Sequence, residues 1–185
     1  PAVGFLYWQI GDLFLMPIQH TEQLMTPNLF SISRPWVELI FHINEKKSTM
    51  INWFGLLFTV FVPVYMAYKA RHKHINEVLP GIFIACFVCM MIFQASAMGA
   101  YVIAYIMAVL FEIIDIRKTK HLVILLVLNW LTVVQPFIWV YLKQPAYITP
   151  AMFSNLSFLF EYVLQVMNVL CFFWVLRETY RKVVL

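Results

Sequence analysis

The chain has 185 residues, of which 63% are hydrophobic and 12% are charged, with a formal net charge of +4. A soluble domain carries about 25% charged residues, so this composition excludes an ordinary soluble protein. The 17 phenylalanines and five glycines make the apolar runs bulky and continuous, which excludes the alternating pattern of a membrane β-barrel. We therefore expect an all-α, polytopic transmembrane helical bundle that forms a single domain over 1–185.

The hydrophobic runs in chain order predict the spans. The chain opens with Pro1, which favours a processed or truncated product without a cleavable secretory signal. A hydrocarbon core of about 30 Å takes roughly 17 to 25 helical residues to cross. The run 78–114 is too long for one span, so we divide it at QASAMG (94–99), although one broken helix is the alternative. The six predicted spans are 2–18, 51–69, 79–94, 98–114, 122–142 and 155–176.

The longest connection, 19–50, joins the first two predicted spans. Its middle, TPNLFSISRP (26–35), is bounded by two prolines and is expected to be irregular. The following WVELIFHIN predicts a short interfacial helix near 36–44, with Trp36 as an aromatic anchor. Glu38 and His42 are expected to face water on this helix.

Basic clusters follow three of the predicted spans, at RHKH (71–74), RKTKH (117–121) and RETYRK (177–182). With six spans, nine lysines and arginines lie on one side of the membrane against four on the other, which places both termini on the positive side. Topology alone explains such clusters, and contact with anionic lipid head groups is the functional alternative. No nucleic-acid role follows. The candidate head-group contacts are Arg71, Lys73, Arg117, Lys118, Arg181 and Lys182.

Polar side chains inside a membrane are costly and are expected to face the interior of a bundle. Glu161, Gln165 and Asn168 of the last predicted span are spaced i, i+4 and i+7, so they share one helical face. Hydrogen bonding between helices explains such a face. The alternative is a polar pocket for a lipid head group or a reacting centre. The residues predicted to oppose this face are Asn129, Gln135 and Asp12.

The remaining chemical groups have simpler interpretations. Cys86 and Cys89 lie in an apolar run without a nearby histidine, so we expect them to pack and not to bind a metal. Glu112 and Asp115 end a predicted span and are expected to pair with the basic run after them. We expect neither a metal nor another cofactor.

Several segments together resemble the TLC-domain family of polytopic membrane proteins, which includes ceramide synthases and translocating-chain-associated membrane proteins. The last span and tail, LQVMNVLCFFWVLRETYRK (164–182), look like the closing pattern of the family. LNWLTVVQPFIWVYLKQPAY (128–147) is similar to the span before it. Glu112 at the end of a span, and GDLFLM (11–16) with its long connection to WVELIFHIN, complete the resemblance. It covers most of the chain through short motifs.

The resemblance implies about six helices around a central cavity. The catalytic branch of the family carries two adjacent histidines used in acyl transfer, and His42 matches one of them. Phe41 or Ile43 stands in place of the other. A single histidine needs an orienting partner, and Asp12 or Glu161 are the candidates.

These features favour a non-catalytic, TLC-like membrane protein that acts as a lipid-binding or structural accessory subunit of a larger complex. Its expected partners are membrane lipids and other membrane subunits. A lipid acyltransferase that uses His42 is the first alternative, and a transporter or channel built on the Glu161 face is the second. The expected location is an organelle membrane, either the mitochondrial inner membrane or the endoplasmic reticulum.

Overall fold

The computed structural model describes residues 27–41, 49–94, 108–142 and 149–185. Every regular element in these ranges is a helix, which confirms the all-α class for this part of the chain. A short helical piece also covers 108–112. The elements are α3 (Leu29–Phe41), α4 (Thr49–Lys69), α5 (Ile75–Phe93), α7 (Thr119–Tyr141), the 3-10 helix η2 (Pro150–Ser154) and α8 (Leu156–Val184).

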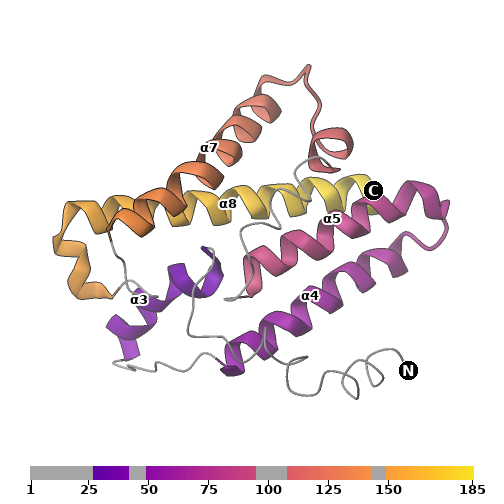
Figure 1. The fold of residues 1–185 in the computed structure, drawn as a ribbon. Helices are drawn as coiled ribbons and strands as arrows, with labels where there is room; N and C mark the ends of the chain where they lie inside the picture. Colours follow the sequence, from indigo (N-terminus) through magenta and orange to yellow (C-terminus); the bar gives the residue numbers. More distant parts are fainter. Residues whose placement is uncertain (1–26, 42–48, 95–107, 143–148) are drawn as a thin grey trace, which may run out of the picture.

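The long helix α8 is the central element of the described fold (Figure 1). α4 and α5 form an antiparallel hairpin, and α5 lies between α4 and α8. α7 contacts α8 and crosses it obliquely, while α3 and η2 pack near the amino-terminal end of α8. The turn between α4 and α5 lies at the other end, close to the carboxyl end of α8 (Figure 1).

Local chemistry explains where two of these helices begin and end. α8 begins after Asn155, whose side chain accepts a hydrogen bond of 2.9 Å from the backbone N–H of Ser157. α5 ends at Phe93, because Gln94 takes an extended backbone conformation. The long apolar run is therefore interrupted at the first residue of the predicted break, and residues 95–107 lie outside the described part.

The prediction of irregular chain up to residue 35 is wrong, because α3 begins at Leu29. The N–H of Ser31 donates to Oδ1 of Asn28 at 2.9 Å, and the N–H of Asn28 donates to Oγ of Ser31 at 3.0 Å. These reciprocal bonds satisfy two backbone donors at the start of the helix, as in a capping box. Pro35 is then accommodated within the helix and is buried.

The expected orientation of α3 is tested only at Glu38, which was expected to face water. Glu38 is half-buried, whereas Ile40 is 66% exposed and Phe41 is 64% exposed. The cause is that α3 turns Ser31 and Pro35 inward and packs against α8 and η2. His42 lies outside the described residues.

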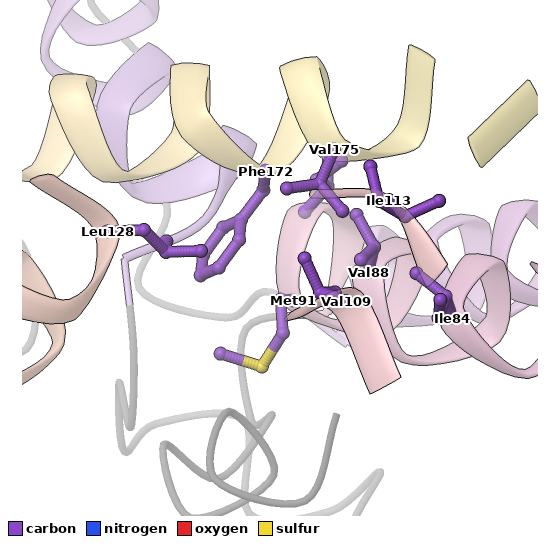
Figure 2. Packing of buried hydrophobic residues seen from close by; sticks show 9 residues of the cluster. Ile84, Val88, Met91, Val109, Ile113, Leu128, Phe172 and Val175 are labelled. Carbon is purple, nitrogen blue, oxygen red and sulfur yellow. The ribbon is translucent and has the colours of Figure 1, made fainter. Parts of the chain in front are cut away.

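The main apolar core joins α5, the 108–113 segment, α7 and α8 (Figure 2). Phe172 of α8 extends between Leu128 of α7 and Met91 of α5, and is fully buried. Close packing of this kind holds membrane helices together as well as soluble ones. The core residues are Ile84, Val88, Met91, Ile92, Val109, Ile113, Leu128, Phe172 and Val175.

Two glycines allow close approach between helices. A Cβ on Gly55 of α4 would overlap the carbonyl oxygen of Phe93, which belongs to α5. A Cβ on Gly81 of α5 would overlap a methyl group of Val183 on α8. Near Gly55, Gln94 donates from Nε2 to the Thr59 hydroxyl at 3.2 Å and so links α4 to the end of α5.

The outer surface of the described helices is rich in large apolar side chains. Phe54 and Phe61 on α4 are 63% and 65% exposed. By length and composition, α5 and α8 can each cross a membrane, while the apolar parts of α4 (Phe54–Lys69) and α7 (Thr119–Thr132) are shorter. Of the other two predicted spans, 98–114 is described only from residue 108 and 2–18 lies outside the described part.

Candidate functional site

The side chains on the buried face of α8 change from polar to apolar along the helix. Glu161, Gln165 and Asn168, in its amino-terminal half, are 0%, 1% and 5% exposed. Gln165 donates from Nε2 to Oε1 of Glu161 at 3.2 Å. After Asn168, the same face continues with Phe172 and Val175 of the apolar core. The predicted polar face is thus buried in the structure.

Two amide oxygens on this face are acceptors without a donor. Oε1 of Gln165 and Oδ1 of Asn168 are buried and accept no hydrogen bond in the described part of the chain. An unsatisfied buried acceptor costs about 1–3 kcal/mol. Each oxygen can accept a hydrogen bond from a suitable donor, and the described residues of this face supply no complete set of reacting groups.

Of the predicted partners of this face, only the side chain of Asn129 lies in the described part of the structure. Asn129 is exposed and donates from Nδ2 to the carbonyl oxygen of Leu125 in its own helix, at 2.8 Å. The expectation that Asn129 faces Glu161 is therefore wrong, because α7 turns Leu128 and Leu131 inward instead. Nothing is described for the side chain of Gln135, and Asp12 also lies outside the described residues.

Three aromatic side chains form contacts between α3 and the start of α8. The indole Nε1–H of Trp36 donates to the Tyr162 hydroxyl at 2.6 Å, and that hydroxyl donates to the carbonyl oxygen of Ile32 at 2.7 Å. Phe153 of η2 lies against both rings, with centroids 6.0 Å from Trp36 and 5.1 Å from Tyr162. Trp36 thus holds two helices together, a role that sequence reasoning did not give it.

The three basic clusters gather at one end of the described bundle. Val183 of α8 packs in one cluster with Met66, Ala70 and Val78, which flank the α4–α5 turn. Lys182 reaches across to Glu112 at the end of the 108–112 helix, with Nζ 2.6 Å from Oε2. The segments 69–77, 112–120 and 177–182 that meet here contain nine lysines and arginines and four acids. We call this the basic end.

Three of the four acids at the basic end are paired with cations. Asp115 pairs with Lys118 at 3.3 Å, as expected from the sequence, whereas Glu112 pairs with Lys182 and not with the run that follows it. Glu178 pairs with Arg181 at 3.5 Å. The Arg117 backbone N–H, and then Lys118, stabilise the charged carboxylate of Asp115 and lower its pKa.

A pocket of about 550 Å³ opens at the basic end, between the 113–121 segment and the last turns of α8. His121 lies edge-on to Trp174 with ring centroids 5.1 Å apart, and its Nδ1 accepts the backbone N–H of Asp115 at 3.2 Å. Nε1 of Trp174 is buried and has no acceptor within the described ranges. The pocket is lined by Ile113, Asp115, Lys118, Lys120, His121, Trp174, Glu178, Arg181, Lys182 and Leu185.

The pocket unites only part of the predicted head-group set. Lys118, Arg181 and Lys182 line it, but Arg117 does not. Arg71 and Lys73 belong to the α4–α5 turn, where the Arg71 guanidinium lies 4.7 Å from the centroid of the Tyr68 ring.

The predicted head-group set does not include Lys120, His121 and Trp174, which also line the pocket. For Trp174 the signal was present, because it precedes Glu178 and Arg181 by four and seven positions and so shares their face of α8.

The described residues contain no cluster of side chains suited to binding a metal ion. Among the described residues, no three histidine, cysteine, aspartate or glutamate side chains come together in a metal-binding group. Cys86, Cys89 and Cys171 are free thiols within helices.

No family model, curated protein or solved structure matches this chain. The resemblance to the TLC-domain family therefore stays a prediction. The geometry described above is the basis for assigning a function.

Proposed function

We propose that the chain is a polytopic integral membrane protein without catalytic activity, which serves as a lipid-binding accessory subunit of a membrane complex. The observation that carries this proposal is a distribution of polar and apolar side chains opposite to that of a soluble protein. Polar side chains such as Glu161 and Gln165 are fully buried, while large apolar side chains cover the outside of α4 and α3. Water disfavours this arrangement and a hydrocarbon solvent favours it.

The basic end supports one orientation across the membrane. Lysines and arginines close to span ends stay predominantly on the cytoplasmic or matrix side. The three clusters meet at one end of the described bundle, and α8 runs from there to the opposite end near η2. Six spans, four of them corresponding to α4, α5, α7 and α8, fit this arrangement. The membrane is that of an organelle, and fractionation distinguishes the mitochondrial inner membrane from the endoplasmic reticulum.

The two alternatives receive less support. The acyltransferase hypothesis needs His42 with Asp12 or Glu161, and of these only Glu161 lies in the described part. The transporter hypothesis rests on one polar face of one helix, whereas transporters place binding groups on paired broken helices. No observation adds to either.

Membrane extraction combined with cysteine labelling tests the proposal. The full chain should stay in the membrane pellet after alkaline carbonate treatment. An impermeant maleimide should label His72→Cys and Lys120→Cys from the same side of sealed vesicles, and Thr149→Cys from the opposite side. The unsubstituted chain is the control for its three native cysteines. Release by carbonate, or labelling of all three sites from one side, contradicts the proposal.

Co-purification tests the accessory role. Solubilised in mild detergent, the chain should migrate with other membrane subunits as one stable species on native gels. Recovery as a monodisperse monomer counts against this part of the proposal and leaves the membrane assignment standing.

A further inference from the structure

The pocket at the basic end contains more hydrogen-bond donors than the protein itself satisfies. Lys118, Arg181 and Lys182 each have an acidic partner, at 3.3, 3.5 and 2.6 Å. Lys120 forms no ion pair within the described ranges, although it lines the same pocket. The buried Trp174 indole N–H also has no acceptor there. Among the described residues, the pocket groups without a partner are thus the Lys120 ammonium, a cation, and the Trp174 indole N–H, a neutral donor.

The chemistry of these groups selects the ligand class. An indole nitrogen is a donor only, and a buried one normally finds an acceptor. Lysine ammonium groups bind phosphate as point charges, with strong charge-assisted hydrogen bonds. Asp115 and Glu178 form ion pairs with Lys118 and Arg181, and all four side chains line the pocket. The lining side chains of lysine and arginine outnumber those of aspartate and glutamate by four to two, which favours an anion.

We propose that this pocket binds a phosphate group, contacted by Lys120 and by the indole N–H of Trp174, with Lys118, Arg181 and Lys182 around it. The proposal rests on the proposed function, because it takes the phosphate to be the head group of an anionic lipid at the membrane surface. A small soluble phosphate ester has the same chemistry, and the experiment separates the two sources.

Lipid binding by matched variants tests the site. The full chain, purified in mild detergent, is titrated with phosphatidic acid, and with phosphatidylcholine as the zwitterionic comparison. Lys120→Gln and Trp174→Phe each remove one proposed contact, and Trp174→Phe retains an aromatic ring. Lys69→Gln is the matched control, because it removes one positive charge at the same end of the bundle but outside the pocket.

We expect phosphatidic acid to bind more tightly than phosphatidylcholine. Lys120→Gln and Trp174→Phe should each weaken its binding by about tenfold, and Lys69→Gln by less than about twofold. Equal binding of the two lipids overturns the proposal. An equal loss in Lys69→Gln and Lys120→Gln also overturns it, because that result indicates general attraction by the basic end. Circular dichroism establishes that each variant is folded, and Lys120→Gln decides alone if Trp174→Phe is not.

Glycerol 3-phosphate, a soluble ester without acyl chains, identifies the source of the phosphate. Failure to displace phosphatidic acid indicates that the lipid head group is the ligand. Displacement that depends on Lys120 and Trp174 supports the site and assigns it to a soluble phosphate ester. These outcomes are independent of carbonate extraction, so a failure of the membrane assignment is recognised separately.

Discussion

The two halves of α8 present different chemistry to the same bundle. The carboxyl half turns Phe172 and Val175 into an apolar core contributed by three other segments. The amino half turns Gln165 and Asn168 inward, with amide oxygens that accept no hydrogen bond in the described part of the chain. The helix is continuous, so periodicity alone does not distinguish the halves. The carboxyl half contributes apolar packing, whereas the amino half contains buried acceptors that no donor in the described part satisfies.

The largest expected effect comes from the apolar half. Phe172→Ala removes a fully buried ring and should lower the free energy of unfolding by about 3 kcal/mol, because neighbouring helices fill the cavity incompletely. Leu170→Ala is the control, since Leu170 is 60% exposed. Unfolding by sodium dodecyl sulfate in mixed micelles measures both. Equal losses of unfolding free energy in the two variants would contradict the proposed difference between core and surface positions.

Close packing of α5 against this half gives a second prediction. Gly81→Ala should lower the free energy of unfolding by about 1–2 kcal/mol, because the added methyl group overlaps the Val183 side chain. Val183→Ala in the same chain should recover most of that loss, beyond the sum of the two single effects. A strictly additive double variant, measured in the same unfolding assay, means that the two residues are not in contact.

The polar half should respond in the opposite direction. Asn168→Leu removes an acceptor that has no donor among the described residues, and it should leave the free energy of unfolding unchanged or raise it by up to about 1 kcal/mol. Thr179→Val is the comparison, since the Thr179 hydroxyl donates to the carbonyl oxygen of Val175 at 2.7 Å. If Asn168→Leu destabilises the chain more than Thr179→Val, Asn168 has a partner and the contrast between the halves is smaller than described.

The smallest effect is a dependence on pH at the basic end. Folding lowers the pKa of Asp115, so its contribution to stability is present above the unfolded pKa and is lost as the pH falls through the folded pKa. The acid branch of the stability curve, below about pH 4, should therefore be less steep in Asp115→Asn. Thermal unfolding of both proteins across that range measures the difference. Parallel curves would mean that the turn at 115–118 does not contribute.

Sequence patterns predicted the helical class and the sharing of one face by Glu161, Gln165 and Asn168, because both follow from local spacing. They did not predict the rotation of α7, where Asn129 and Leu128 are adjacent and packing alone decides which one turns inward. The pocket was only partly foreseeable. Lys182, which lines the pocket, forms an ion pair with Glu112, a residue 70 positions away in the sequence. No local sequence pattern predicts a contact between such distant residues.

The capping of α3 shows a second kind of failure. Asn28 and Ser31 were interpreted as loop residues between two prolines, yet the same polar side chains start a helix when they bond to each other's backbone. Two flanking prolines often indicate irregular chain, but here the capping pair of Asn28 and Ser31 starts a helix after the first proline.

The unequal lengths of α5 and α8 have a consequence for the choice of membrane. α8 has 29 residues and α5 has 19, which correspond to about 44 Å and about 29 Å of helix. In the proposed membrane orientation, a hydrocarbon layer of about 30 Å matches α5, so the last turns of α8, with Arg181 and Lys182, extend past it. A thicker bilayer would draw those charges toward the acyl chains or would have to become thinner around the pair, at a cost that grows with each ångström. Bilayer thickness is therefore expected to influence in which membrane this protein is stable.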